Sequence, residues 1–280
     1  MEFSVNGGYV IYEDDTITGF GGRIESVVIP EELDIKYIAK KAFFGAKNLN
    51  QVILPDTIVK IGEWAFASCS SLKRFTALGK PEFLQGVFLN DESLNEIHIK
   101  GGERFAALLS AVCTQMNSEY LLTPDEAGSI EWYNKFDSRL LDILKEDDSA
   151  GYEKYVLCGE EDLLFDINVY IKSNQKRKNS LVYLRLIYDD MLREENKAFL
   201  EKYLKNTAVG KENESGFLVL LEHSSDDMYI DLYLKLGMLD EDNFENTIQR
   251  LGQKHATLKA KMIQYHDSME KKDFFDDMLL

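Results

Sequence analysis

The stretch Ile24-Glu25-Ser26-Val27-Val28-Ile29-Pro30 recurs 25 positions later as Leu49-Asn50-Gln51-Val52-Ile53-Leu54-Pro55. Looser copies begin at Leu72 and Leu94, after 23 and 22 further positions. Each copy has an apolar position, then two positions of any type, then two apolar positions separated by one of any type. A pattern of this kind, repeated at this period, is typical of a solenoid whose coils each add a short parallel strand. The repeat therefore predicts three to four stacked coils within residues 1–100.

Side chains alternate between the two faces of each predicted strand. The inward-facing residues are expected to stack as a core ladder: Val27, Ile29, Val52, Leu54, Phe75, Ala77, Ile97 and Ile99. The residues between and beside them are expected to face outward on the concave side and to form the candidate binding face: Ser26, Val28, Gln51, Ile53, Arg74, Thr76, Glu96 and His98. Pro30 and Pro55 are expected to end the ladder, because proline cannot donate a backbone hydrogen bond.

A second repeated element lies between the strands, at 38–43, 61–66 and 83–88. Its phenylalanines Phe43 and Phe66 are predicted to be core residues. The isoleucine-proline strand end with a following Ala-Phe resembles the BspA-type leucine-rich repeat over about residues 20–100. The opening stretch 3–12 resembles the hairpin that starts many such proteins, and its Asn6-Gly7 suits a tight turn. The resemblance implies a binding surface, displayed at the cell surface in some members, and no catalysis.

The remainder of the chain is predicted to be helical. Phe105, Leu108, Leu109 and Val112 recur at helical spacing, and the apolar residues keep that period from Trp132 onward. The first of these helices is expected to cap the open end of the solenoid, which would otherwise expose a strand edge and core residues.

Within the helical part a weaker repeat predicts helix pairs of about 33 residues. The segment 161–167 resembles 226–232, 65 positions later, and 194–200 lies close to midway. The segments 181–184 and 217–220 are the expected buried partner helices, and 220–226 resembles the end of an ankyrin repeat. The predicted fold class is thus an α/β leucine-rich-repeat solenoid with an N-terminal hairpin at 1–100, followed by an all-α domain of ankyrin-like helix pairs at 101–280.

The net charge of the chain is −17, with a pI near 4.7. Most of the excess follows residue 100, because residues 1–100 hold 10 basic and 14 acidic side chains and the rest holds 22 and 35. Such a field repels phosphate backbones and anionic membrane surfaces, so nucleic acid is not an expected partner. No run of about eighteen uncharged apolar residues occurs, so we expect no insertion into a membrane.

The compartment is inferred from the termini and the cysteines. The N-terminus shows no basic start followed by an apolar run, which favours a cytoplasmic protein, whereas a leader removed beforehand would leave a cell-surface protein. Cys69, Cys113 and Cys158 are odd in number and widely separated, which favours a reducing compartment. Cys69 is predicted to be a small core residue and not a nucleophile.

No motif predicts catalysis, a metal or a cofactor. His98, His223, His255 and His266 are at no metal-ligand spacing, although His98 lies beside Glu96 on the predicted binding face. The segment 19–22, Gly-Phe-Gly-Gly, lacks the lysine and following helix of a phosphate-binding loop and is predicted to be a turn.

Charged clusters are interpreted as structural. Acidic clusters lie at 13–15, 146–148, 160–162 and 226–227, and the last three are predicted to begin helices. The basic run Lys172 with 176–178 is predicted to lie in a link between two helices, either solvated or facing an acidic partner. Phe44 and Trp64 are off the core register and are expected to be exposed on the convex flank, where aromatic residues favour contacts.

These observations predict a non-catalytic module that binds a protein through the concave strand face, the helical domain, or both. Two alternatives stay open at this point. The first is an exported cell-surface adhesin of BspA type, which requires an export signal or an anchor. The second is an enzyme with an unrecognised site in the helical domain, which requires a deep pocket with converging carboxylates or His223.

Overall fold

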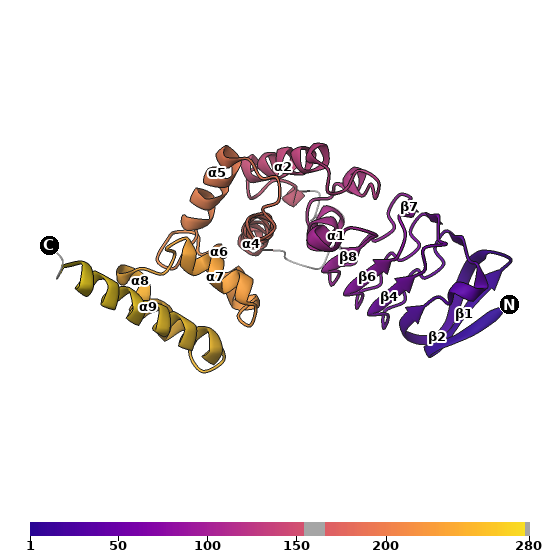
Figure 1. The fold of residues 1–280 in the computed structure, drawn as a ribbon, viewed down its shortest axis with the longest axis horizontal. Coiled ribbons are helices and arrows are strands. Elements are labelled where there is room, and N and C mark those ends of the chain that lie inside the picture. Colours follow the sequence, from indigo (N-terminus) through magenta and orange to yellow (C-terminus); the bar gives the residue numbers. More distant parts are fainter. Residues whose placement is uncertain (154–165, 278–280) are drawn as a thin grey trace. The chain divides into compact units, whose positions relative to one another are not determined.

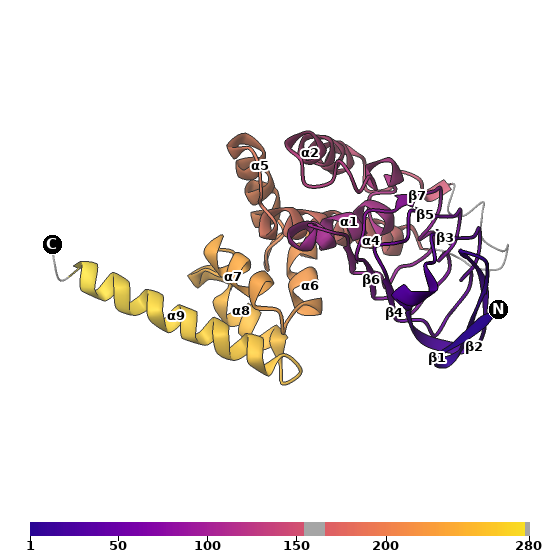
Figure 2. The ribbon, with the colours of Figure 1, turned by 45° about the vertical axis from the view of Figure 1, so that its right-hand side comes forward.

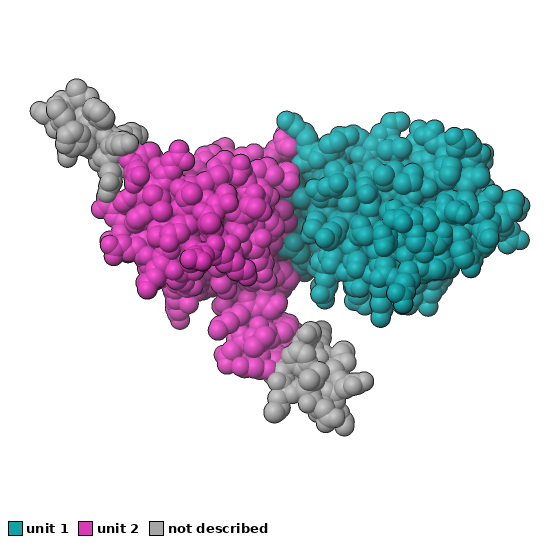
Figure 3. Space-filling view, turned by 90° about the horizontal axis from the view of Figure 1, so that it is seen from below, with its two compact units in different colours: residues 1–141 teal, residues 142–280 magenta. Residues whose placement is uncertain are grey.

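The computed structural model describes residues 1–153 and 166–277. The chain forms two compact units, residues 1–141 and residues 142–280 (Figure 3). The change from strands to helices lies earlier, between His98 and Glu103. The domain division predicted at residues 100 and 101 follows that change, and it stays a prediction.

The chain begins with a hairpin. Strand β1 (Glu2–Glu13) pairs antiparallel with β2 (Thr16–Val28), and Asp14 in the tight turn between them has a φ of 51°. The first residues fold back on β1, because Met1 and Tyr12 exchange two backbone hydrogen bonds of 2.7 and 2.9 Å. Gly7, with a φ of +85°, supplies the bend. The predicted N-terminal hairpin is therefore confirmed.

The glycines at 19–22 do not form the predicted turn. They lie inside β2, where Phe20 pairs with Val10 and Gly21 pairs with Tyr9. A Cβ atom on Gly21 would stand 2.3 Å from the Tyr9 ring, so glycine is required here by the close approach of a neighbouring side chain. A strand glycine of this kind cannot be distinguished from a turn glycine by composition alone.

The solenoid is built from two ladders of parallel strands. The end of β2 pairs with β4 (Gln51–Leu54), β4 with β6 (Arg74–Ala77), and β6 with β8 (Glu96–His98), and Figure 1 shows these strands side by side. The start of β2 pairs with β3 (Tyr37–Ile38), followed by β5 (Lys60–Ile61) and β7 (Glu82–Phe83), visible in Figure 2. A short 3-10 helix, η1 (Glu31–Leu33), follows β2. The predicted solenoid and the register of its four strands are confirmed.

Phenylalanine side chains fill the centre of the coils. Phe43 and Phe66 are fully buried and stack with ring centroids 5.0 Å apart, and Phe88 continues the stack 6.1 Å from Phe66. Phe75, from β6, meets the Phe66 ring edge-on at 5.3 Å. The core positions predicted for Phe43 and Phe66 are correct, and the rings hold consecutive coils together.

A buried carboxyl lies beside this core. Asp91 is 2% exposed, and its Oδ1 accepts a hydrogen bond of 2.7 Å from the Cys69 backbone N–H. Burial, only partly offset by that hydrogen bond, raises the Asp91 pKa to about 7. Burial and the nearby Asp91 raise the Cys69 pKa to about 12, so the thiol stays protonated and Cys69 is the core residue that was predicted.

Each coil contains a turn residue in the left-handed region at an equivalent position: Lys41 (φ 60°), Trp64 (φ 55°) and Gly86 (φ 68°). The Trp64 ring lies against Gly86, where an added Cβ would be 2.3 Å from ring atoms. The Nζ atoms of Lys40 and Lys41 lie 4.6 and 5.0 Å from the ring centroid. These contacts offset the cost of a left-handed tryptophan, which is on the order of 1–2 kcal/mol.

Helices close the end of the solenoid as predicted. After Gly101 (φ 75°) the chain forms η2 (Glu103–Phe105) and α1 (Ala106–Thr114), and α1 packs on β8, with Ser110 Oγ donating to the Leu94 carbonyl at 2.5 Å. Then follow η3 (Glu119–Leu121) and α2 (Ile130–Lys145). The indole Nε1 of buried Trp132 donates to the Leu121 carbonyl at 2.8 Å and fixes α2 on η3.

Among its described residues, the second unit contains helices α4 (Ile167–Ile187), α5 (Glu194–Lys205), α6 (Ser215–Glu222), α7 (Asp227–Lys235), α8 (Glu241–Leu251) and α9 (Ala256–Asp277). Helix α4 packs against α5, α6 and α7, while α9 packs against α7 and α8. The first residues of α5 and α7 are 33 positions apart, which agrees with the predicted period of about 33 residues for a helix pair. The all-α region is thus confirmed, and its ankyrin-like arrangement stays a prediction.

Two predictions about charged clusters are wrong. The basic run does not lie in a link but inside α4, which begins at the Asp166 cap. The acidic cluster 146–148 follows the end of α2 instead of beginning a helix. The cluster 160–162 and Cys158 lie outside the described residues, whereas Asp226 caps α7 as predicted, accepting from the Met228 N–H at 3.0 Å.

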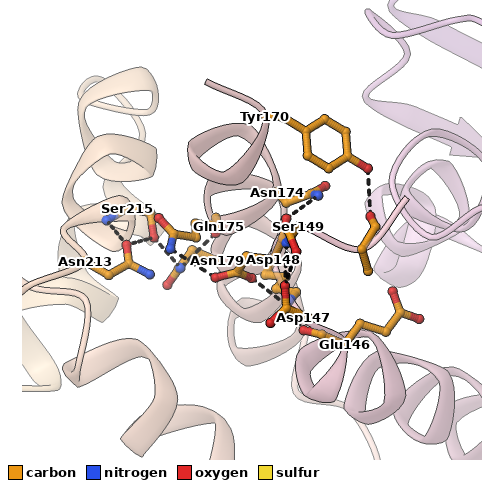
Figure 4. A network of polar contacts seen from close by, with 12 residues as sticks. Glu146, Asp147, Asp148, Ser149, Tyr170, Asn174, Gln175, Asn179, Asn213 and Ser215 are labelled. Carbon is orange, nitrogen blue, oxygen red and sulfur yellow. Dashed lines mark hydrogen bonds and ion pairs between the residues drawn. The ribbon is translucent and has the colours of Figure 1, made fainter. Parts of the chain in front are cut away.

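These two clusters are connected. The Lys178 side chain is 3% exposed, and its Nζ donates to Asp148 Oδ1 at 2.6 Å. Asn174 and Gln175 of α4 donate to the backbone carbonyl and to Oδ2 of Asp148 at 2.9 and 3.0 Å. Figure 4 shows the acidic segment against α4, with Asn179 continuing the network to Ser215. A carboxylate distant in sequence thus compensates the buried lysine of the basic run.

Candidate binding face

The eight residues predicted to face outward lie together on one face of the β2-β4-β6-β8 ladder. Backbone pairing aligns them in two rows, Ser26, Gln51, Arg74 and Glu96 in the first and Val28, Ile53, Thr76 and His98 in the second. All eight are exposed or half-buried, while the residues between them are buried. We call this surface the ladder face.

One end of the ladder face carries a small ionic network. Arg74 Nε donates to Glu96 Oε2 at 2.7 Å, and His98 Nε2 lies 3.0 Å from the same oxygen. Partial burial would raise the Glu96 pKa, but the hydrogen bonds from His98 and Arg74 outweigh it and hold the pKa below its ordinary value. The Glu96 carboxylate is therefore ionised at neutral pH and its charge is largely compensated within the face.

Two hollows flank this network. The larger, about 530 Å³, lies at the end of the ladder and is bordered by Thr76, Leu78, His98 and Lys100 besides Arg74 and Glu96. A smaller one, about 310 Å³, is bordered by Asn50, Gln51, Lys73, Arg74, Asn95 and Glu96. Arg74 and Glu96 thus form the wall between two solvent-open depressions.

Leu78 and Lys100 were not predicted as site residues. Both stand two positions after a ladder-face residue, at the places that Pro30 and Pro55 occupy in the first two coils. Leu78 is 47% exposed, and both side chains border the larger hollow. The absence of proline at these two positions was the sequence signal for them, because a side chain other than proline there extends the outward face by one residue per coil.

At the opposite end of the ladder face, the second row carries aliphatic side chains. Val28 on β2 is 55% exposed, and its neighbour Ile53 on β4 is half-buried. The face therefore changes from aliphatic to charged along the direction in which the strands stack. A partner can therefore bury apolar side chains against the aliphatic end and form ion pairs at the charged end.

A further hollow of about 400 Å³ lies in the second unit, where Lys172, Lys211, Arg250, Glu214 and Leu218 are among its lining residues. Arg250 Nη1 pairs with Glu214 Oε2 at 2.6 Å. Lys172 is the only member of the basic run that borders this hollow. The described lining of the hollow includes two carboxylates, Glu212 and Glu214, and no histidine.

The remaining histidines are engaged in packing. His223 stacks on Tyr229 with centroids 3.8 Å apart, and burial lowers the His223 pKa. His266 stacks on Phe244 at 3.8 Å, and His255 Nδ1 lies 3.0 Å from Ser224 Oγ. Within residues 1–153 and 166–277, no group of three histidine, cysteine or acidic side chains is arranged to hold a metal ion.

The two aromatic residues expected on the flank differ in exposure. Phe44 is 48% exposed, with Lys41 Nζ 5.4 Å from its ring centroid. Trp64 is half-buried, because its ring is covered by Gly86 and two lysines. Of these two aromatic residues, Phe44 is the one open to contact.

None of the helices in the described part of the chain combines the length and the apolar character needed to cross a membrane. The most apolar helices, α1 and α6, have 9 and 8 residues, well short of the roughly 20 that a bilayer core requires.

Comparison with known proteins identifies the repeats. Residues 20–133 match the BspA type leucine rich repeat region in six copies. This match confirms the resemblance in the N-terminal part, and its last portion, after residue 101, covers helices η2, α1, η3 and the start of α2.

Two solved structures are similar to parts of the chain. A leucine-rich repeat protein of T. pallidum is 29% identical over 35% of this chain and 49% of its own, with a TM-score of 0.29. A leucine-rich cell surface protein of Faecalibacterium prausnitzii is 25% identical over 36% of this chain and 27% of its own, with a TM-score of 0.22. The matched part thus spans about half and about a quarter of these proteins. The search of curated proteins finds no match.

Proposed function

We propose that this chain is a non-catalytic module that binds another protein through the ladder face. The observation that carries the proposal is the alignment of eight outward side chains from four strands into two continuous rows. The match to a leucine-rich repeat family supports a protein-binding role in general. The choice of this face is our own inference.

Physical considerations support the use of a strand ladder for binding. Its backbone is fixed by parallel pairing from coil to coil, so the outward side chains lose little further freedom when a partner docks. The rows run across strands at about 4.8 Å per step, which places neighbouring contact residues close enough to meet consecutive groups of a partner. Binding then follows from shape, apolar contact and charge, without a chemical step.

The test compares partner capture by two sets of variants. The first set, Ile53→Asp, Thr76→Lys and His98→Glu combined, alters the ladder face. The matched control, Val59→Asp with Leu89→Asp, alters exposed apolar residues outside this face, which are 51% and 49% exposed. Circular dichroism first establishes that both variants fold like the wild type.

A partner that the wild type and the control capture from source-cell lysate, and that the ladder-face variant loses, supports the proposal. A partner captured equally by all three proteins contradicts it and moves the interaction to another surface. Capture of no partner by the wild type counts against a binding function.

A second candidate is an exported adhesin that uses the same face at the cell surface. The match to BspA-type repeats favours it, because some proteins with such repeats are surface proteins. Protease treatment of intact source cells distinguishes the two locations. Digestion of the protein on intact cells supports the adhesin, and protection until lysis contradicts it.

A further inference from the structure

The charged end of the ladder face has a sign opposite to that of the whole chain. Lys73, Arg74 and Lys100 border the two hollows there, together with the carboxylates Glu96 and Glu103. The balance is slightly positive, whereas the chain carries a net charge of −17. A local excess of this sign draws acidic groups toward this end while the remaining surface repels them.

The basic groups are available to a partner. The Nε atom of Arg74 donates to Glu96, and within the described residues its terminal guanidinium nitrogens make no hydrogen bond. Within the same residues, no ion pair engages Lys73 or Lys100, and both are exposed. The two terminal nitrogens of Arg74 can therefore donate to both oxygens of a partner carboxylate while Nε stays bonded to Glu96.

The carboxylates at this end do not cancel the attraction. Glu96 Oε2 already meets Arg74 and His98, at 2.7 and 3.0 Å. Glu96 thus orients the Arg74 side chain. Of the acidic side chains that border the larger hollow, Glu103 is the one outside this network. A partner carboxylate that approaches Arg74 and Lys100 meets more positive than negative charge.

Val28 on β2 lies three strand spacings from Lys100, which follows β8, and two spacings from Arg74 on β6. Ile53 on β4 is one spacing from the strand of Arg74. Three spacings of about 4.8 Å amount to about 14 Å, which an extended chain covers in about four residues. We propose that the partner presents an extended acidic segment, with carboxylates at Arg74 and Lys100 and, within about four residues of them, aliphatic side chains on Val28 and Ile53. This inference rests on the proposed function and specifies the chemistry of the partner.

The probe is a fluorescein-labelled hexapeptide of two leucines, two serines and two glutamates, followed by fluorescence anisotropy. Arg74→Glu with Lys100→Glu is expected to weaken binding about tenfold or more, because both attractive charges become repulsive. Lys36→Glu with Lys47→Glu is the matched control, since it changes the net charge equally away from the ladder face. Replacing the leucines by serine is expected to weaken binding of the wild type as well.

Binding of the glutamate peptide that the ladder variant loses and the control retains supports the inference. It is overturned if the control weakens binding equally, if a peptide with lysines in place of glutamates binds as well, or if the wild type binds no peptide. If the ladder-face variant loses the captured partner but the glutamate and lysine peptides bind equally, the proposed function stands and the inference of an acidic partner segment is wrong. When that partner is retained, the proposed function fails with it.

Discussion

In the coils of residues 1–100, a core residue and its equivalent one coil later have similar surroundings, whereas each described helix of residues 142–280 has surroundings of its own. Val52, Phe75 and Ile97 occupy one register position on successive strands, and all are fully buried. By contrast, Asp226 caps α7 through one hydrogen bond, and Asp240 caps α8 through a reciprocal capping box.

This difference indicates how each unit is stabilised. The solenoid depends on contacts that pass from coil to coil, so a change in one coil is transmitted to its neighbours. The helices depend on separate caps, pairs and packing contacts, so a change there is expected to stay near its origin. The following substitutions test this contrast, from the largest expected effect to the smallest.

Phe66→Ala is expected to destabilise the solenoid most, by about 3–5 kcal/mol, because it removes the ring that joins Phe43, Phe75 and Phe88. Hydrogen exchange should show loss of protection in β4, β6 and β8 together, while α4–α9 remain protected. Phe44→Ala, at a position 48% exposed, is the control and should change stability by about 0.5 kcal/mol or less. Equal loss of protection in the helices would contradict the separation of the two units.

Asp91→Asn is expected to stabilise the solenoid above pH 7. The folded-state pKa, about 7, exceeds the ordinary value of 3.8, so the folded chain holds this proton more tightly than the unfolded chain. The contribution of Asp91 to stability is therefore greatest below pH 4 and is lost as the pH rises to about 7, by on the order of 3–4 kcal/mol. Asparagine keeps the acceptor for the Cys69 N–H without the charge.

Urea unfolding between pH 4 and 8 checks this sign. The difference between Asp91→Asn and the wild type should grow with pH and level off above pH 7. The exposed Glu92→Gln is the neighbouring control and should leave the profile of the wild type unchanged. A difference that shrinks as the pH rises would show that the sign is wrong.

Asp148→Ala is expected to destabilise the helical unit by about 2–3 kcal/mol, because it leaves the buried Lys178 ammonium without its carboxylate. Adding Lys178→Met should recover most of this loss in thermal unfolding. The exposed pair of Lys40 and Glu63 provides the comparison, and Glu63→Ala should cost less than about 1 kcal/mol. No recovery in the double variant would mean that the other contacts of Asp148 carry its effect.

Asp226→Ala is expected to have the smallest effect, about 1 kcal/mol, because it removes one capping hydrogen bond at the start of α7. Hydrogen exchange should be faster in the first turn of α7 and unchanged in α8. The exposed Asp231→Ala, within the same helix, serves as the control. Faster exchange throughout the unit would show that the helices are less independent than proposed here.

The repeat could be recognised from the sequence because each coil restates the same apolar positions. Strand alternation then placed all eight ladder-face residues outward, as the structure has them. Their role in binding is a further step that alternation does not supply. Leu78 and Lys100 were overlooked because they lie just beyond the strand motif, where only the loss of proline indicates a change.

The errors arose where a neighbour distant in sequence decides the local structure. In β2, Gly21 accommodates the Tyr9 ring from β1, whereas the composition of 19–22 alone suggests a turn. Lys178 is buried in α4 because Asp148, 30 residues earlier, pairs with it. The second half of α4 is apolar and buried, whereas Ile167 and Val169 at its start are 41% and 62% exposed, so no buried stripe marks the first half as helix.

The contact between Trp64 and Gly86 also restricts how such an array can grow. A gene duplication that copied one 23-residue coil would place a second tryptophan in the position below Trp64, where the structure has only the hydrogen of a glycine. The inserted coil would match in length and register but would collide at that position. Lengthening the solenoid by copying the coil of Trp64 therefore requires two events, the duplication and a tryptophan-to-glycine substitution, which makes its coils less interchangeable than their shared period suggests.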